Sequence, residues 1–370
     1  MKKQLYFLSG IIVLALILIS WGGTGHYKIN SAASLSFNQE MSQFSSWTGI
    51  LAEHASDADI RKDWDDNEYP KHYIDIDNYS EFISNGTIPQ TLDGAIAAHG
   101  SYFVYDNGIL PWATVAAYDS LKSCFERADW DKAVLFASDL GHYVADGHMP
   151  LHITRNYNGY DTDNDGIHSR FESTMINNYI SQINYAGENI NLVSDVNQYV
   201  FDYIYSNYIY VDSVLLADDY AKTFSTDTYS SEYQAALWNY SKGFTTKLFE
   251  NASHALTELI FTAWTEAGSP SMTPTGTDNS LAESTVILEQ NFPNPFTNST
   301  TIQFRLKENT KVLLQIKDIL GSTIFTLIND FKTTGDHSIV FNSENLSKGI
   351  YYIVLETDKN HLVKEIIKID

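Results

Sequence analysis

The sequence contains a single cysteine, Cys124, so no disulfide can form within the chain, and this thiol is most simply a small buried apolar group. Basic residues are also scarce, because 23 Lys and Arg stand against 46 Asp and Glu, a net charge of -23. Residues 21–283 carry this excess, with 36 acidic and 12 basic side chains. A surface this negative repels nucleic acid and anionic membranes unless bound cations change the local field. We therefore expect no stable nucleic-acid partner.

Long hydrophobic runs are missing beyond the first 20 residues, so no later stretch is suited to crossing a bilayer. Residues 1–20 start with two lysines, continue with an apolar run over 11–19 and end at Ser20. This order predicts a secretory signal peptide, an exported protein and no transmembrane helix once the peptide is removed. A retained anchor helix is the alternative.

Hydrophobic spacing changes along the 370 residues, which are enough for more than one domain. Residues 21–268 show mostly helical periodicity without alternating strands, which predicts an all-α domain. Residues 269–285 are rich in Ser, Thr, Pro and Gly and predict a linker. In residues 286–370 the period becomes two, as in 302–306, and turn residues separate the runs, which predicts a small β-sandwich.

The segment 130–147 has the clearest helical pattern. Its residues 133–137 are all apolar, which is typical of a helix inside a domain. His142 and Asp146 are four residues apart and project from one face, which also includes Leu135, so we expect that face to be buried. Two buried ionisable groups are costly unless they pair or bind a cation. A hydrogen-bonded pair inside a core and a metal site are both consistent with the spacing.

Two further groups lie downstream. Pro150 disturbs the helix and can turn His152 toward the same point as the preceding histidine and aspartate. His168 and Glu172 are again four residues apart, and imidazole with carboxylate is a donor set that suits zinc.

Upstream, Asp59 and His72 form another candidate pair, although a loop separates them and neighbouring acids are equally available. Cleavage after Ser20 would make Trp21 the new N-terminus. A free α-amino group titrates near neutrality, so it can bind zinc together with the Trp21 carbonyl oxygen. His26 lies close enough in the sequence to complete that site.

Five motifs occur in order: Trp-Gly-x-x-Gly-His, Ala-x-x-Ala-Asp, His-Tyr-Ile-Asp, His-x-x-x-Asp-x-His-x-Pro-Leu-His and His-x-x-x-Glu. Together they resemble the zinc-dependent phospholipase C and single-strand-specific nuclease superfamily. The resemblance spans residues 21–268 and implies an all-α catalytic domain with three zinc ions. It further implies that a zinc-bound water attacks phosphorus, with Asp59 orienting or deprotonating that water.

Carried over by position, the resemblance implies three sets of metal ligands. The first set comprises Asp59, His72, His142 and Asp146. The second set comprises His152, His168 and Glu172. The third set comprises Trp21 and His26, with Asp146 bridging. Two other histidines are expected at the substrate pocket, namely His99 and His148.

The segment that ends in Glu172 resembles the phospholipase branch, because the nuclease branch more often places Asp there. The acidity of the chain also disfavours a long polyanion. We therefore expect a phospholipid or another phosphodiester as substrate. The alternatives are a single-strand-specific nuclease of the same superfamily and, from another class, a non-catalytic metal-stabilised surface protein.

Residues 161–172 also fit the spacing of a twelve-residue calcium loop, although no helix pattern precedes them. With Glu172 assigned to zinc, calcium would be held by Asp161, Asp163 and Asp165 alone. A solvated acidic turn is the other interpretation.

The C-terminal segments 288–306, 318–321 and 347–369 resemble the type IX secretion sorting domain. This resemblance covers residues 286–370 and implies the type IX secretion machinery as a partner. It also implies a protein that is secreted or attached at the cell surface. A substrate-binding sandwich domain is the alternative.

Overall fold

The computed structural model describes residues 22–272, 286–288, 291, 293–294, 296–317, 323–343, 346–357 and 360–369. The chain divides into two compact units, Met1–Pro274 and Thr275–Asp370, which we call the helical unit and the β unit. The predicted signal peptide, Trp21 and residues 273–285 of the predicted linker lie outside the described residues. Across the ranges that the structure describes, no helix has both the length and the apolar character to span a membrane.

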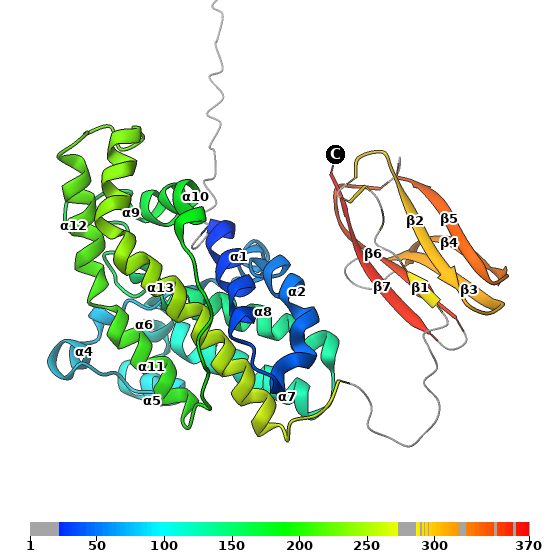
Figure 1. The fold of residues 1–370 in the computed structure, drawn as a ribbon, viewed down its shortest axis with the longest axis horizontal. Helices are drawn as coiled ribbons and strands as arrows, with labels where there is room; N and C mark the ends of the chain where they lie inside the picture. Colours follow the sequence, from blue (N-terminus) through cyan, green and yellow to red (C-terminus); the bar gives the residue numbers. More distant parts are fainter. Residues whose placement is uncertain are drawn as a thin grey trace, which may run out of the picture. The chain divides into compact units, whose positions relative to one another are not determined.

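The helical unit consists of α-helices joined by short turns (Figure 1). The α-helices in chain order are α1 (Gly22–Ala33), α2 (Trp47–Glu53), α3 (Asp57–Arg61), α4 (Ser80–Asn85), α5 (Leu92–His99), α6 (Ser101–Asp106), α7 (Leu110–Glu126), α8 (Trp130–Gly147), α9 (Ile167–Ser169), α10 (Ile176–Tyr179), α11 (Val196–Asn207), α12 (Tyr210–Lys222) and α13 (Ser231–Glu266). The helical turns are η1 (Ser34–Ser36), η2 (Glu40–Ser46), η3 (Tyr69–His72), η4 (Ile76–Asn78), η5 (Pro150–His152), the π-helical η6 (Arg170–Met175) and η7 (Ile180–Gln182).

Helix α8 lies at the centre of the helical unit and packs against α1, α2, α7 and α13. Its second half, residues 140–147, is buried on every side. Gly141 allows this close packing, because a Cβ there would lie 2.3 Å from Oδ1 of Asn30 on α1 and 2.7 Å from Leu256 on α13. His142 and Asp146 are therefore held in the interior.

The first half of α8 buries one face, which includes Ala133 and Ala137, and leaves the opposite face at the surface of the unit. Leu135 is 42% exposed, so the expectation that its face is buried over the whole helix is wrong at this position. Seven residues fall about 20° short of two helical turns, so Leu135 is displaced around the axis from His142. More importantly, the neighbouring helices enclose only the second half of α8.

The β unit consists of two antiparallel sheets with the strand orders β1-β2-β5 and β4-β3-β6-β7. The strands are β1 (Val286–Leu288), β2 (Ser299–Leu306), β3 (Thr310–Lys317), β4 (Thr323–Lys332), β5 (Gly335–Asn342), β6 (Gly349–Glu356) and β7 (His361–Lys368). Alternate residues of β2 and β3 are buried in one apolar core that both sheets share. The predicted fold class, an all-α domain followed by a small β-sandwich, is confirmed.

Candidate metal centre

Helix α8 supplies two buried side chains at the centre of the cluster. The Nε2 atom of His142 lies 3.4 Å from Oδ2 of Asp146, one helical turn away. The Nδ1 atom of His142 lies 2.7 Å from the carbonyl oxygen of Ala55. Because a carbonyl oxygen can only accept, Nδ1 carries a proton, and Nε2 is the ring nitrogen that faces the cluster.

Asp59 on α3 and His72 on η3 converge on the pair from α8. The Nδ1 atom of His72 lies 2.9 Å from Nε2 of His142 and 3.1 Å from Oδ2 of Asp146. Oδ1 of Asp59 lies 3.6 Å from both Nδ1 of His72 and Nε2 of His142. Asp59, His72 and His142 therefore offer ligand atoms within 4.8 Å of one another, close enough to share one metal ion.

A second group of potential ligands follows Pro150. The Nε2 atoms of His168 and His152 lie 2.5 Å and 3.5 Å from Oε2 of Glu172. Nδ1 of His152 donates to the carbonyl oxygen of His72 at 2.7 Å, which leaves Nε2 as the ring nitrogen able to bind a metal ion. Glu172 lies on the π-helical turn η6, a widened geometry that is frequent at functional sites. These three side chains can hold a metal ion.

A third group includes His26 on α1. Its Nε2 lies 3.6 Å from Oδ1 of Asp146, and its ring stacks on His142 with centroids 3.8 Å apart. Trp21, the predicted N-terminal ligand, lies outside the described residues. The next residue, Gly22, donates its backbone N–H to Oε1 of Glu172 at 3.3 Å. The start of the described chain is thus in contact with the second group.

The cluster contains buried polar atoms that lack hydrogen bonds. Within the described ranges, neither ring nitrogen of His26 has a hydrogen-bond partner, and Oδ2 of Asp59 has neither a hydrogen bond nor an ion pair. Burying such atoms is costly unless another group replaces the lost water. Imidazole nitrogen and carboxylate oxygen are common ligands of zinc, which usually takes four. The residues present therefore fit divalent metal ions.

Burial and local charge set the protonation of the cluster. Burial lowers the pKa of His26 well below its ordinary value, and the neighbouring His142 acts in the same direction, so the imidazole is neutral. For Asp146, burial alone would raise the pKa, but the surrounding histidines outweigh it and hold the pKa well below its ordinary value. Burial alone would lower the pKa of His142 and His152, but the neighbouring carboxylates outweigh it and raise these pKa values to about 9 and about 8. A metal ion bound to these two rings would therefore have to displace a proton from each.

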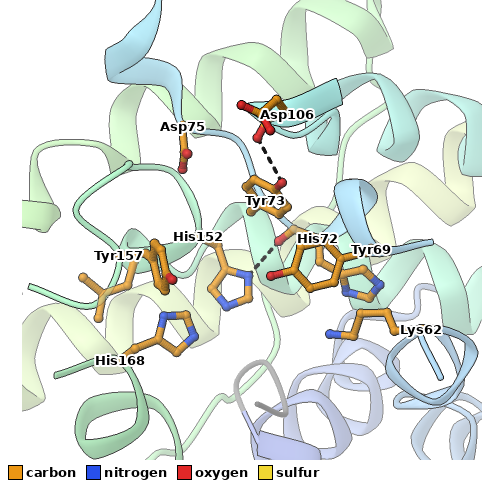
Figure 2. A pocket seen from close by; sticks show the side chains of 10 residues that line it. Lys62, Tyr69, His72, Tyr73, Asp75, Asp106, His152, Tyr157 and His168 are labelled. Carbon is orange, nitrogen blue, oxygen red and sulfur yellow. Dashed lines mark hydrogen bonds between the residues drawn. The ribbon is translucent and has the colours of Figure 1, made fainter. Parts of the chain in front are cut away.

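The cluster borders a cavity of about 280 Å³ (Figure 2). His72, His152 and His168 line one side of it, and Lys62 lies close to His72. The Nζ atom of Lys62 lies 2.6 Å from Oδ1 of Asp59. This end of the cavity therefore combines potential metal ligands with a basic side chain, an arrangement suited to an anion.

The other end of the cavity is aromatic and acidic. Tyr73 lies there with Asp75 and Asp106, whereas Tyr69 and Tyr157 line the cavity beside the histidines (Figure 2). The hydroxyl of Tyr73 donates to the backbone carbonyl of Asp106 at 3.2 Å. Burial, reinforced by neighbouring carboxylates, raises the pKa of Asp75 to about 7. Aromatic rings and carboxylates together suit a cationic group.

The two histidines that were expected at the substrate pocket lie elsewhere. His148 stacks on Tyr203 with centroids 4.5 Å apart and lines a separate cavity. It follows Asp146 by two residues, which corresponds to about 200° around a helix axis, so it points away from the cluster. The Nε2 atom of His99 lies 2.5 Å from Oε1 of Glu81, and His99 does not line the cavity beside the cluster. The sequence expectation for both residues is corrected accordingly.

The acidic turn suggested as a calcium loop is open to solvent. Asp161, Asp163 and Asp165 are all exposed, and Asp161 pairs with Arg155 at 3.2 Å. Among the residues described, these three carboxylates are not one of the groups whose ligand atoms converge. The geometry matches the alternative interpretation, a solvated acidic turn, and offers calcium no preformed site.

Two charged residues beside the cluster were not predicted. Lys62 follows Asp59 by three residues, a spacing that brings side chains together on a helix. Glu68 is buried with Oε1 3.5 Å from Nε2 of His72, four residues later. The four-residue spacing of Glu68 and His72 could have indicated that the two side chains are neighbours on a helix. However, Pro70 interrupts the helical pattern, and the many acidic residues nearby suggest a solvated surface.

Among protein-family models, the match that we find lies in the β unit. Residues 290–369 match the model described as secretion system C-terminal sorting domain. This match confirms the predicted sorting domain. The protein is therefore secreted or displayed at the cell surface, and the sorting domain implies the type IX secretion machinery as its partner.

Comparison with curated proteins gave no match. Among solved structures, the alpha toxin of Clostridium absonum is 11% identical, with a TM-score of 0.42 and coverage of 94% of this chain and 95% of that chain. The alpha-toxin of Clostridium perfringens from the avian strain SWCP is 14% identical, with a TM-score of 0.39 and coverage of 94% of each chain. At these TM-scores, neither likeness supports an inference about the metal centre.

Proposed function

We propose that this protein is a secreted zinc-dependent hydrolase of phosphoric ester bonds with phospholipase C-like activity. The observation that carries the proposal is the buried convergence of histidines and carboxylates beside a cavity. The five ordered motifs that resemble the zinc-dependent phospholipase C and nuclease superfamily agree with it. Bound zinc would act as a Lewis acid toward a phosphodiester and would activate water.

The proposed ligand sets are those that the motifs imply. One ion is assigned to Asp59, His72, His142 and Asp146. A second is assigned to His152, His168 and Glu172. A third is assigned to Trp21 and His26, with Asp146 bridging. Support comes from three groups of described side chains whose ligand atoms lie within 4.8 Å of one another: Asp59, His72 and His142; His152, His168 and Glu172; and His26, His142 and Asp146. They overlap with the motif sets, although His142 rather than Asp59 or His72 accompanies His26 and Asp146.

The chain's own groups have separate proposed roles. Asp59 is the proton acceptor, because its carboxylate is buried and, among the described residues, its Oδ2 has no hydrogen bond or ion pair. Lys62 places a positive charge beside Asp59, where it can face the oxygens of a phosphodiester. Carbonyl groups hold the Nδ1 protons of His142 and His152, so both rings keep a fixed orientation.

The two ends of the cavity favour a zwitterionic head group. A phosphodiester would lie at the end with Lys62 and the metal ligands. A cationic group a few ångströms away would meet Asp75, Asp106 and the ring of Tyr73. A phospholipid with a choline or ethanolamine head group carries these two charges in this order.

A nuclease of the same superfamily is the second candidate. Tyr69 and Tyr157 line the cavity and can stack on bases, which favours this alternative. Asp75 and Asp106 oppose it, because they would repel the phosphates that flank the cleaved one. A non-catalytic, metal-stabilised surface protein is the candidate from another class, since the same ligands can serve stability alone.

Hydrolysis of a chromogenic phosphodiester tests the proposal directly. We expect activity that a chelator abolishes and added zinc restores, and then a preference for phosphatidylcholine over single-stranded DNA. Absence of hydrolysis by zinc-loaded protein would favour the non-catalytic alternative, whereas preferential DNA cleavage would favour the nuclease.

Two buried histidines provide a matched pair of variants. His142→Asn should lose activity and bound zinc, because it removes a proposed ligand. His148→Asn should keep its zinc, because His148 lies outside the cluster. Equal zinc content in both variants would contradict the ligand assignment.

A further inference from the structure

Two solvent-exposed tyrosines line the cavity beside the cluster, and a third exposed tyrosine contacts one of them. Tyr69, Tyr157 and Tyr160 are 59%, 40% and 65% exposed, and we call them the tyrosine rim. Figure 2 shows Tyr69 and Tyr157 on either side of His152. The ring of Tyr160 lies 6.2 Å from that of Tyr157, edge to face. Exposed aromatic rings gathered at the entrance of a cavity indicate a surface that meets a partner.

The rim comes from two separate segments of the chain. Tyr69 begins the turn η3, which also carries the cluster residue His72. Tyr157 and Tyr160 belong to the connection between η5 and α9. The ring of Tyr157 also contacts His168 at 5.7 Å, edge to face. The same backbone segments that position the proposed ligands therefore position the rim, so a partner seated on it would lie directly over the cavity.

The charges next to the rim select the kind of partner. Three basic side chains line the cavity or lie within two residues of the rim, and each forms an ion pair within the chain: Lys62 with Asp59, Lys71 with Glu68, and Arg155 with Asp161. Among the residues that the structure describes, Asp75 and Asp106 at the cavity form no ion pair with a basic side chain.

A zwitterionic bilayer is complementary to this surface. Its outermost groups are cationic, so they match the carboxylates, and tyrosine rings are enriched where membrane and water meet. Anionic lipid and single-stranded DNA would need cations that are not already paired. We propose that the tyrosine rim docks the protein on the surface of a zwitterionic lipid bilayer, with the cavity opening toward the head groups. The significance of the docking rests on the proposed function, whereas the docking itself requires no hydrolysis.

Binding can be measured without turnover by using vesicles of a phosphonate analogue of phosphatidylcholine. In this analogue a CH₂ group replaces the bridging glycerol oxygen, so the bond that a phospholipase C breaks is absent. We expect the zinc-loaded full chain to sediment with these vesicles. The triple variant Tyr69→Ser, Tyr157→Ser, Tyr160→Ser should bind at least about tenfold more weakly, because it removes the interfacial rings.

Single substitutions separate an effect of the tyrosine rim from a general effect of replacing an exposed tyrosine. Tyr229→Ser is the matched control, because Tyr229 is 86% exposed and does not line the cavity, and its binding should be unchanged. Tyr160→Trp should bind more tightly, since tryptophan also favours the interface. Tyr160→Ser should slow hydrolysis of vesicles while leaving hydrolysis of monomeric short-chain phosphatidylcholine unchanged, because Tyr160 does not line the cavity.

The docking proposal and the proposed function fail in different ways. Binding to the uncleavable vesicles without hydrolysis of phosphatidylcholine would support the rim and overturn the proposed function. The docking proposal would be overturned if the triple variant bound vesicles as tightly as the parent protein while the parent still hydrolysed monomeric phosphatidylcholine. Tighter binding to phosphatidylglycerol vesicles or to oligothymidylate than to zwitterionic vesicles would also overturn it.

Discussion

The helical unit and the β unit differ in what they bury. The core of the β unit is apolar, with residues such as Ile302, Leu314 and Ile366 meeting between its two sheets. The helical unit also has an apolar core, but beside it His26, His142 and Asp146 are completely buried. Apolar groups gain by leaving water, whereas ionisable groups lose hydration that must be replaced. The apolar core of the β unit therefore needs no bound ion for its stability, whereas the buried ionisable side chains of the helical unit would be stabilised by a bound cation.

The largest expected effect follows from removing the carboxylate that the proposed sites share. Asp146→Ala should reduce hydrolysis by about a thousandfold or more, because Asp146 contacts side chains of two ligand groups and bridges to His26. Bound zinc, measured by mass spectrometry, should fall as well. Asp165→Ala is the matched control, since Asp165 is exposed, and a similar loss in that variant would point to a general effect of charge.

Removal of metal should affect the two units unequally. If zinc is present at about a thousand times its dissociation constant, it contributes about 4 kcal/mol to the free energy of unfolding. At about 2–4 °C per kcal/mol, chelation should lower the melting temperature of the helical unit by on the order of 10 °C. The melting temperature of the β unit should not change.

Calorimetry of the full chain with and without chelator, followed by addition of zinc, would measure this difference. Equal shifts in both units would contradict the comparison, and so would a helical unit that melts at the same temperature in both conditions. Recovery on adding zinc would separate metal loss from irreversible damage.

The N-terminal ligand gives a stoichiometric prediction. An extra residue before Trp21 moves the α-amino group by about 3.8 Å. Such a protein should retain two of three zinc ions and lose activity, because Gly22 already contacts Glu172 and leaves little room for displacement. An extension at the C-terminus is the control. Full zinc content in the N-terminally extended protein would refute the assignment of Trp21.

The smallest expected effect concerns the acidic end of the cavity. Burial raises the pKa of Asp75 to about 7, so its carboxylate attracts a cationic head group above that pH and loses the attraction below it. The ratio of kcat/KM for a choline phosphodiester to that for a neutral one should fall several-fold as pH decreases through about 7. Asp75→Asn should make this ratio low and independent of pH.

Stability provides an independent check of the same group. The folded protein holds the Asp75 proton up to about 7, whereas the unfolded chain releases it near 3.9, so ionisation of Asp75 destabilises the fold as pH rises through this window. Asp75→Asn should therefore melt at a higher temperature than the parent at pH 8 and at the same temperature near pH 3. A variant that is less stable at pH 8 would contradict the raised pKa.

Local patterns were sufficient for much of the architecture. The helix 130–147 and the strands near the C-terminus follow from periodicities of 3.6 and 2, which local geometry imposes on any chain. The four-residue spacing of His142 and Asp146 and of His168 and Glu172 likewise fixes which side chains face each other. Leu135 shows the limit of such reasoning, because which part of a helix is enclosed depends on its neighbours.

The surroundings of the cluster depended on contacts between distant segments. Glu68 beside His72, the tyrosine rim and the carboxylates of Asp75 and Asp106 all come from loops whose course no periodicity describes. His99 and His148 illustrate the converse, since both were attractive as chemistry-bearing residues and both point elsewhere.

The amino-acid sequence by itself determined the two fold classes, the sorting domain and the residue types able to bind metal, because propensity, periodicity and short spacings act over one or two turns of the chain. The tertiary structure decided the distances at which Asp59, His72 and α8 meet, the stacking of His26 on His142, and the acidic character of one end of the adjoining cavity. Those features depend on the packing of segments tens of residues apart, where the burial of apolar surface selects the arrangement and the polar groups follow from it.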